Sequence, residues 1–267
     1  MKLTFLGTGT SFGVPVIGCD CDTCASPDPR DRRTRHAAIV EAGGRSLLVD
    51  TPPELRIQLL RAGVTNLDAV WYTHTHADHI HGIDDLRVFQ KKGPVRVFIS
   101  AEHKRRVVSS FPYIFGADAH AGPRSTIPKI DLRIFDGTEP LRLLGHQATP
   151  LRVPHGRGRS YGLRIGPLGY VTDAKSLPDR TLRALEGVRV LVLNALWFGD
   201  PHPAHFSVEE AVEAARQVGA ERTYLTHLTH RVSQKELDQR LPDGFFAAYD
   251  GLTIEVPSAP SEERNSR

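Results

Sequence analysis

Four side chains that could bind metal crowd into six consecutive positions of this sequence: His74, His76, Asp78 and His79. They follow the short apolar run 69–72, which has the composition of a β-strand. Imidazole and carboxylate groups are usual ligands of zinc, manganese and iron. Side chains two residues apart on an extended chain point the same way, so His74 and His76 are expected to face one ion. Asp78 and His79 come after the chain has turned and are expected to face a second ion. A histidine-rich loop without metal is the alternative.

Three more potential ligands lie far along the chain. His155, Asp173 and His227 each come directly after an apolar, β-like run. Loops at the ends of strands often form functional sites, so these side chains could complete the centre that the histidine cluster begins. Each residue alone is also typical of a hydrogen-bonded histidine or of an aspartate in a turn.

The three cysteines of the chain, Cys19, Cys21 and Cys24, lie within six positions. An odd number of cysteines at such close spacing is a poor basis for disulfide bonds. In a reducing compartment, thiols spaced in this way more often bind metal. The segment therefore predicts a second metal site, with idle or redox-active thiols as the alternative.

Composition indicates a globular protein of 267 residues, with 40% hydrophobic and 24% charged residues. We expect one domain over residues 1–256 and a disordered polar tail over 257–267. The apolar runs are too short to span a membrane, and glycines interrupt the N-terminal run too early for a signal peptide. We therefore expect a cytoplasmic protein with no membrane partner. A net charge of +3 suits an anionic substrate without indicating a nucleic-acid surface.

Short runs rich in β-branched and aromatic residues recur along the chain, with helical patterns between them. The predicted strands are 2–6, 37–41, 46–50, 69–73, 95–99, 132–135, 148–153, 161–165, 168–172, 189–194, 223–226 and 252–256. The predicted helices are 54–62, 101–110, 178–186, 208–218 and 234–240. This order favours two sheets covered by helices over a doubly wound sheet. Residues 111–130 show no periodicity and are predicted to form either a plain surface connection or a lid.

With these residues in place, the sequence resembles the metallo-β-lactamase superfamily. The series His-x-His-x-Asp-His, followed by a histidine, an aspartate and a histidine, carries the resemblance, which covers about residues 2–256. It implies an α/β (α+β) fold, the αββα four-layer sandwich of the metallo-β-lactamases. It also implies a metal-dependent hydrolase in which two divalent ions share a hydroxide that attacks the substrate. The ions would be zinc or manganese, with iron as a third option.

The resemblance also implies a role for each ligand. One ion would be held by His74, His76 and His155, the other by Asp78, His79 and His227, with Asp173 bridging the two. Asp78 is expected to take part in catalysis as well. Asp50, which ends a predicted strand, resembles an early aspartate of the superfamily that supports the metal-binding loop without touching the ions.

The opening segment narrows the resemblance further. Residues 8–15 read Thr-Gly-Thr-Ser-Phe-Gly-Val-Pro, and with the Cys-x-Cys-x-x-Cys motif they are similar to the phosphoribosyl 1,2-cyclic phosphate phosphodiesterase family. In that family three cysteines and a late histidine hold a structural zinc, which implies a set of Cys19, Cys21, Cys24 and His230. His205 resembles a histidine near the metal centre of that family. We expect it to act as a general acid or as a hydrogen-bond donor to phosphate.

The leading hypothesis is a phosphodiesterase for small, anionic cyclic phosphate esters, and a homodimer is one expectation because relatives are often dimers. Arg157 and Arg159 follow His155 closely and could grip phosphate, or could form a solvated surface pair. A tRNA 3′-processing nuclease would need a broader basic surface than a net charge of +3 suggests. Hydrolysis of a carboxylic ester, thioester or lactone stays open. A zinc-stapled binding protein is the non-enzyme alternative, which the filled set of reactive-site ligands disfavours.

Overall fold

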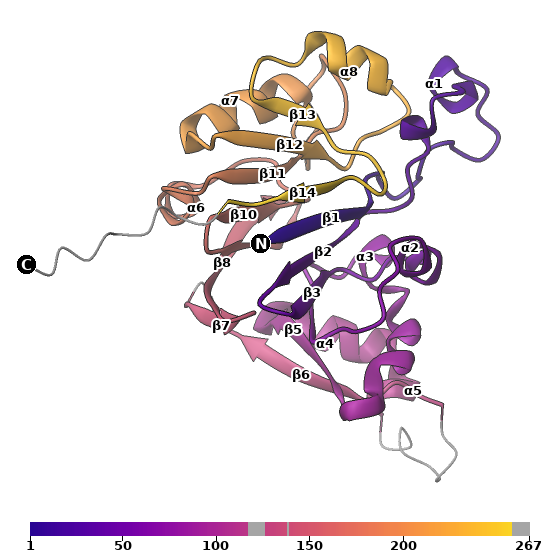
Figure 1. The fold of residues 1–267 in the computed structure, drawn as a ribbon, viewed down its shortest axis with the longest axis vertical. Coiled ribbons are helices and arrows are strands. Elements are labelled where there is room, and N and C mark those ends of the chain that lie inside the picture. The colour runs from indigo at the N-terminus through magenta and orange to yellow at the C-terminus, as the bar shows by residue number, and fades with distance from the viewer. Residues whose placement is uncertain (117–125, 138, 258–267) are drawn as a thin grey trace, which may run out of the picture.

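The structure is a computed structural model that describes residues 1–116, 126–137 and 139–257. Within these residues the strands form two mixed sheets that face each other (Figure 1). Most of the predicted tail, 258–267, and the central part of the predicted excursion, 117–125, lie outside the described residues. No helix in the described parts of the chain is long and apolar enough to cross a membrane.

The first sheet has the order β14-β1-β2-β3-β4-β5-β6. Its strands are β1 (Lys2–Gly7), β2 (Ala37–Ala42), β3 (Arg45–Val49), β4 (Ala69–Trp71), β5 (Val95–Ser100), β6 (Ile130–Phe135) and β14 (Thr253–Glu255). Strands β3 to β6 run parallel to one another, whereas β14, β1, β2 and β3 alternate in direction.

The second sheet has the order β13-β12-β11-β10-β9-β8-β7. Its strands are β7 (Leu141–Leu143), β8 (His146–His155), β9 (Gly158–Ile165), β10 (Leu168–Val171), β11 (Val190–Asn194), β12 (Arg222–Thr226) and β13 (Phe245–Ala247). Strands β10 to β13 are parallel, and β7 to β10 are antiparallel. Each sheet thus has parallel strands on one side and antiparallel strands on the other.

Helices cover the outer faces of both sheets (Figure 1). They are α1 (Asp22–Ala25), α2 (Leu55–Arg61), α3 (Ala77–Ile80), α4 (Ala101–Ser110), α5 (Pro112–Phe115), α6 (Asp179–Leu185), α7 (Val208–Val218) and α8 (Gln234–Arg240), with 3-10 helices η1 (Pro29–Asp31) and η2 (Ile83–Lys92). Three apolar clusters fill the three spaces between four layers. One lies between the sheets, one under α2 to α5, and one under α6 to α8. The predicted αββα sandwich is confirmed.

The capping predictions explain where two helices begin. The Ser207 side chain accepts a hydrogen bond from the Glu210 backbone N–H, and the Glu210 carboxylate accepts one from the Ser207 backbone, a complete capping box for α7. Gly219 ends α7 with a left-handed backbone at a φ of 72°. Ser233 caps α8 in the same way through the Glu236 N–H.

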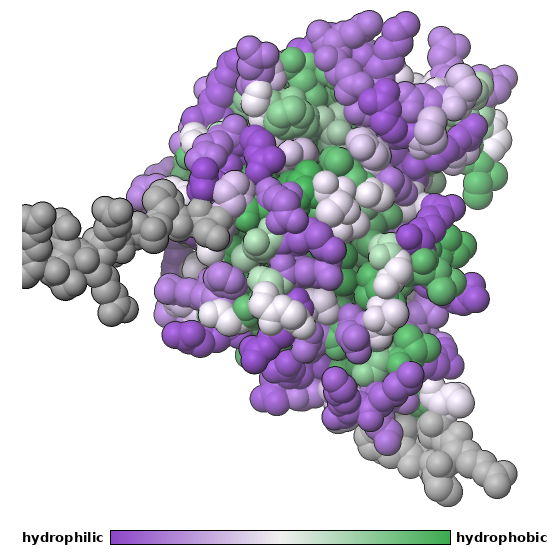
Figure 2. All heavy atoms as spheres, viewed as in Figure 1, coloured by the Kyte–Doolittle hydropathy of each residue, from purple (hydrophilic) through white to green (hydrophobic). Residues whose placement is uncertain are grey.

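Most of the elements that the sequence did not reveal are short, although the ten-residue 3-10 helix η2 was missed as well. Strands β7 and β13 have three residues each, and α1, α3 and α5 have four each, too few for a period to show. Helix α5 lies inside the segment 111–130, which we expected to lack regular structure. Figure 2 shows hydrophilic side chains over most of one face, with apolar surface around α2, where Ile57 and Leu60 are exposed.

Parallel strands bring their carboxyl ends to one edge of each sheet, and this edge carries the predicted ligands. Asp50 follows β3, and the histidine cluster follows β4. Asp173 comes two residues after β10, and His227 follows β12 directly. His155 ends β8, at the turn into β9.

Candidate metal centre

The predicted ligands of the reactive centre converge at this edge. Three groups have donor atoms within 4.8 Å of one another: His74 with His76 and His155; His74 with His79 and Asp173; Asp78 with His79 and His227. Asp173 lies at the middle of the set. Its carboxylate oxygens are 3.4 Å from Nε2 of His79, 3.4 Å from Nε2 of His227 and 3.8 Å from Nε2 of His155. Ligand atoms bound to one ion at about 2.0–2.2 Å lie at comparable mutual distances.

Three residues of the centre have a left-handed backbone. Asp50, Asp173 and His227 have φ values of 62°, 55° and 61°. Each comes within two residues of the end of a parallel strand. Such a backbone costs about 1–3 kcal/mol in a residue other than glycine and persists where the surrounding structure enforces it. The turn is sharp enough to direct each side chain across the end of its sheet.

Asp50 fixes the orientation of two histidines. Its carboxylate accepts a hydrogen bond from Nδ1 of His79 at 2.7 Å. It also accepts hydrogen bonds from the backbone N–H and the hydroxyl of Thr73, at 2.9 and 2.8 Å. Because the Thr73 hydroxyl donates to Asp50, its oxygen accepts from Nδ1 of His74 at 3.0 Å. In His74 this leaves Nε2 as the free, electron-pair-bearing nitrogen, as a metal ligand requires, and in His79 a bound metal would replace the proton on Nε2.

Orphaned polar atoms support a metal in this place. Nε2 of His74, Nε2 of His79 and both ring nitrogens of His227 are buried and have no hydrogen-bond partner among the described residues. Leaving such groups unpaired costs about 1–3 kcal/mol each. Nδ1 of His155 donates to the Ala204 carbonyl at 3.1 Å, which directs its Nε2 toward Nδ1 of His76, 3.3 Å away. The donor set therefore fits divalent cations.

The charges at the centre also favour a bound cation. Burial raises the pKa of the Asp173 carboxyl, but the imidazoles of His227, His79 and His74 outweigh it, so that pKa lies well below its usual range. Burial lowers the pKa of His79, but nearby carboxylates led by Asp173 and Asp78 raise it well above its usual range. The carboxylates therefore stabilise positive charge at this point of the interior.

His205 lies beside the predicted ligands, and one of its ring nitrogens lies within 4.8 Å of donor atoms of His155 and Asp173. Its ring stacks on His227 with centroids 4.9 Å apart, and its Nδ1 is 3.8 Å from an Asp173 oxygen. That Nδ1 is buried without a hydrogen-bond partner. Burial lowers the pKa of His205 to about 3, so the resting imidazole is neutral. A neutral imidazole still donates one hydrogen bond, which suits contact with a phosphate oxygen.

The centre opens into a pocket of about 540 Å³. Arg157 and Arg159 both line it, but they differ in their partners. Arg159 lies 3.7 Å from the Glu102 carboxylate, whereas the exposed Arg157 has no ion pair or hydrogen bond within the described chain.

Ser11 and His103 also line the pocket and were not predicted. His103 lies three residues after β5, and its place at the end of a parallel strand was the signal that could have revealed it. A larger hollow of about 820 Å³ lies over β1 to β3 and includes none of the predicted ligands.

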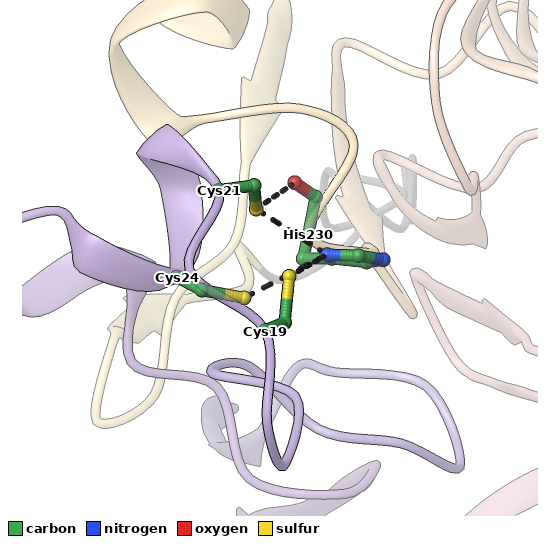
Figure 3. A group of neighbouring side chains, drawn as sticks. All are labelled: Cys19, Cys21, Cys24 and His230. Carbon is green, nitrogen blue, oxygen red and sulfur yellow. Dashed lines mark hydrogen bonds between the residues drawn. The ribbon is translucent and has the colours of Figure 1, made fainter.

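The cysteines form a separate cluster with His230 (Figure 3). Their sulfur atoms lie 3.3, 3.4 and 3.6 Å from Nδ1 of His230, in the order Cys19, Cys21 and Cys24. A tetrahedral zinc with bonds of about 2.3 Å to sulfur and 2.0–2.1 Å to nitrogen has sulfur–nitrogen edges of about 3.5 Å. The spacing of the four donors therefore fits one zinc ion with no open position.

The acid–base properties of the thiols differ within this cluster. A hydrogen bond from the Cys24 backbone N–H lowers the pKa of Cys21 to about 6, so this sulfur is a thiolate at neutral pH. Burial raises the pKa of Cys24 to about 11. Thiolates are the form that binds metal, so a bound cation would favour deprotonation of Cys24 as well.

An αββα sandwich with carboxylate and imidazole donors at the base of an open pocket defines a metal-dependent hydrolase. The chain belongs to the beta-lactamase superfamily, because residues 45–228 match the beta-lactamase superfamily domain. The superfamily predicted from the sequence is confirmed. Its fold implies divalent metal ions, for which the donor groups described above are the candidate ligands.

Solved structures share the whole fold. A diphosphatase from the PhnP family is 37% identical, with a TM-score of 0.88 over 97% of this chain and 98% of that chain. Zinc-bound PqqB from Methylobacterium extorquens has a TM-score of 0.79 at 18% identity, over 96% of this chain and 100% of that one, which indicates a common fold.

Two curated relatives differ in length. A ribonuclease Z from Salinibacter ruber is 28% identical, over 84% of this chain and 88% of that protein. An octanoyltransferase from Porphyromonas gingivalis is 34% identical over 94% of this chain. The chain spans 51% of the octanoyltransferase, about half its length.

Proposed function

We propose that this protein is a dinuclear metal-dependent phosphodiesterase that hydrolyses small cyclic phosphate esters of the ribosyl 1,2-cyclic phosphate type. The convergence of seven donors, six of which line one pocket, carries the proposal. The 37% identity to a diphosphatase from the PhnP family over nearly the whole chain supports phosphate ester chemistry. The guanidinium of Arg157, which has no ion pair within the part of the chain that the structure describes, suits an anionic substrate.

We assign the ligands as two sets that share one carboxylate. His74, His76 and His155 would hold one ion, Asp78, His79 and His227 the other, with Asp173 between them. Two divalent ions, zinc or manganese, would supply a water of lowered pKa and would neutralise charge on the phosphate oxygens. Asp50 keeps His79 and His74 in the tautomer that presents Nε2 to this space.

The other residues of the pocket handle the phosphate and the leaving group. Nδ1 of His205 points to the Asp173 side of the pocket and can donate to a phosphate oxygen or pass a proton to a leaving alkoxide. Arg157 can pair with a phosphate oxygen from the side of the β8–β9 turn. No side-chain nucleophile is required, since hydrolysis needs only an activated water.

We also propose that Cys19, Cys21, Cys24 and His230 hold a structural zinc. The distances between sulfur and nitrogen, 3.3 to 3.6 Å, support a closed tetrahedral site. Such a site ties the segment 19–24 to the segment after β12, far apart in the sequence. Its contribution is to stability, because a fourfold-coordinated zinc leaves no position for substrate.

The direct test is a panel of phosphodiesters assayed with the protein after reconstitution with manganese or zinc. Ribose 1,2-cyclic phosphate, its 5-phosphate, 2′,3′-cyclic nucleotides and bis(p-nitrophenyl) phosphate form the panel. We expect hydrolysis of the first two with the highest kcat/KM. A protein that holds its full metal complement and hydrolyses none of the four would contradict the proposal.

A ribonuclease Z activity is the second candidate, because a ribonuclease Z shares 28% identity over 84% of this chain. Electrostatic contacts to many phosphates make RNA binding fall steeply with salt. A steep slope with a tRNA precursor would favour the nuclease, and a flat one the small-ester hydrolase. A thioester substrate belongs in the same screen, since a carboxylic thioesterase could use the same ions.

A further inference from the structure

His103 belongs to the wall of the reactive pocket but to neither metal set. It is the third residue of α4, which begins directly after β5. It lines the pocket together with Arg157 and His205. Its side chain is 14% exposed, so it is held in the wall and still reaches the pocket.

Two contacts fix the orientation of its ring. Nε2 of His103 lies 3.0 Å from the backbone carbonyl of Arg159 on β9. The ring also meets Tyr161 edge to face, with centroids 5.9 Å apart and planes at 90°. Tyr161 in turn donates its hydroxyl to the Glu102 carboxylate at 3.1 Å. Helix α4 and the β8–β9 hairpin thus hold the imidazole in one position.

The carbonyl contact decides the tautomer. A carbonyl oxygen can only accept, so Nε2 of His103 must carry the proton. Burial lowers the pKa of His103, which keeps the ring neutral at neutral pH. Nδ1 is then a lone-pair acceptor of hydrogen bonds.

Outside the candidate metal ligands, the other titratable side chains that line this pocket are donors, although the hydroxyls of Ser11 and Thr75 can also accept. Arg157, Arg159 and His205 are donors that suit the oxygens of a phosphate. Nδ1 of His103, as an acceptor, therefore needs a hydrogen-bond donor on a part of the substrate other than its phosphate. A neutral hydroxyl, such as those of a sugar, is a donor of this kind.

We infer that His103 is a specificity-determining residue whose Nδ1 accepts a hydrogen bond from a pentose hydroxyl of the phosphate ester substrate. The inference rests on the proposed phosphodiesterase function and names the part of the substrate that the metal centre does not select. A site that hydrogen-bonds a substrate hydroxyl rejects analogues without it. His103 would thus distinguish sugar phosphates from simple diesters.

Two substitutions test the roles of the two ring nitrogens of His103 independently. In His103→Gln the amide N–H takes the place of Nε2, so the contact to the Arg159 carbonyl is kept and the acceptor is lost. In His103→Asn the side-chain oxygen takes the place of Nδ1, so the acceptor is kept. We expect His103→Gln to lower kcat/KM for ribose 1,2-cyclic phosphate, relative to bis(p-nitrophenyl) phosphate, by about three- to tenfold. The ratio should fall less in His103→Asn. Lys104→Gln, exposed on the same helix, is the control and should leave the ratio unchanged.

The 3-deoxy and 5-deoxy analogues of ribose 1,2-cyclic phosphate complete a thermodynamic cycle. For the analogue that lacks the contacted hydroxyl, we expect kcat/KM of the wild-type protein to fall by about the same factor as His103→Gln lowers it for the full substrate. Combining the variant with that analogue should lower kcat/KM little further. Losses that simply add for both analogues would overturn the inference, as would an equal fall for sugar and synthetic diesters. A wild-type protein that hydrolyses no phosphodiester would instead overturn the proposed function. The two failures are therefore distinguishable.

Discussion

The reactive centre and the cysteine cluster both use histidine donors, but their geometries suit different functions. At the reactive centre, imidazole nitrogens are buried without partners at the base of an open pocket of about 540 Å³. In the cysteine cluster three sulfurs close around one nitrogen at 3.3 to 3.6 Å (Figure 3). Open positions allow a substrate to bind beside the metal, whereas a closed tetrahedron can only stabilise. The arrangement of the donors, more than their identity, separates the two functions.

The two sites are joined by one short segment. His227 belongs to the reactive centre and His230, three residues later, to the cysteine cluster. Between them, the Leu228 N–H donates to the Thr8 carbonyl at 2.9 Å, which ties this segment to the N-terminal strand region. The cluster therefore anchors a ligand of the reactive centre at its far end. Substitutions at each site test whether the two sites are as separate in function as they are in geometry.

The largest effect should follow removal of charge from the centre of the reactive set. We expect Asp173→Asn to lower kcat for any phosphodiester substrate by at least about 10³-fold, because its carboxylate lies among three imidazoles. Metal content by mass spectrometry should fall at the reactive centre and not at the cysteine cluster. Asp179→Asn on the exposed face of α6 is the matched control. Retained turnover in Asp173→Asn would contradict the assignment of Asp173 to a catalytic metal centre.

The next effect should depend on the leaving group. If His205 delivers a proton, His205→Ala should lower kcat by about 10²- to 10³-fold for a cyclic sugar phosphate, whose leaving alkoxide is basic. The loss should be much smaller for bis(p-nitrophenyl) phosphate, whose leaving group needs no proton. Equal losses for both substrates would favour hydrogen bonding to phosphate over proton transfer. His202→Ala is the neighbouring control, since His202 does not line the pocket.

Loss of the metal site formed by the three cysteines and His230 should lower the melting temperature strongly and kcat only weakly. We expect Cys21→Ser to bind about one metal ion fewer per chain, and its melting temperature to fall by about 10 °C. Below that temperature, kcat should stay within a few-fold of wild type. Asp22→Asn, exposed at the start of α1, provides the comparison. A collapse of kcat in fully folded Cys21→Ser would show that the segment 227–230 couples the two sites.

The sequence predicted the long and periodic elements well. Helix α7, for example, was predicted from residues 208 to 218, and the structure has it at Val208–Val218 with its capping box. That prediction succeeded because the capping pair, the apolar period and the final glycine agree along one local stretch. Strand β13 of three residues was missed, because it pairs with β12 only through the packing of the whole sheet.

The site shows the same division between local and long-range information. His74, His76, Asp78 and His79 stand out because they lie together in the sequence. His103 did not, since a single histidine after one predicted strand is a much weaker signal than four neighbouring ligands. Its role depends on a contact to Arg159, 56 residues away, that only the folded chain creates. Pairing of distant residues of this kind is what a single sequence does not supply.

The two arginines of the pocket should give the smallest and most selective effect. The sequence could not tell them apart, but Arg159 lies 3.7 Å from Glu102, whereas Arg157 has no such partner within the described residues. We expect Arg157→Ala to raise KM about three- to tenfold for an anionic cyclic phosphate and to leave stability unchanged. Arg159→Ala should instead lower the free energy of unfolding by about 0.5 kcal/mol, as befits a half-exposed ion pair, with a smaller change in KM. Steady-state kinetics and chemical denaturation of both variants decide the matter. A reversed pattern would mean that Arg159 binds the phosphate and that its contact to Glu102 gives way when substrate arrives.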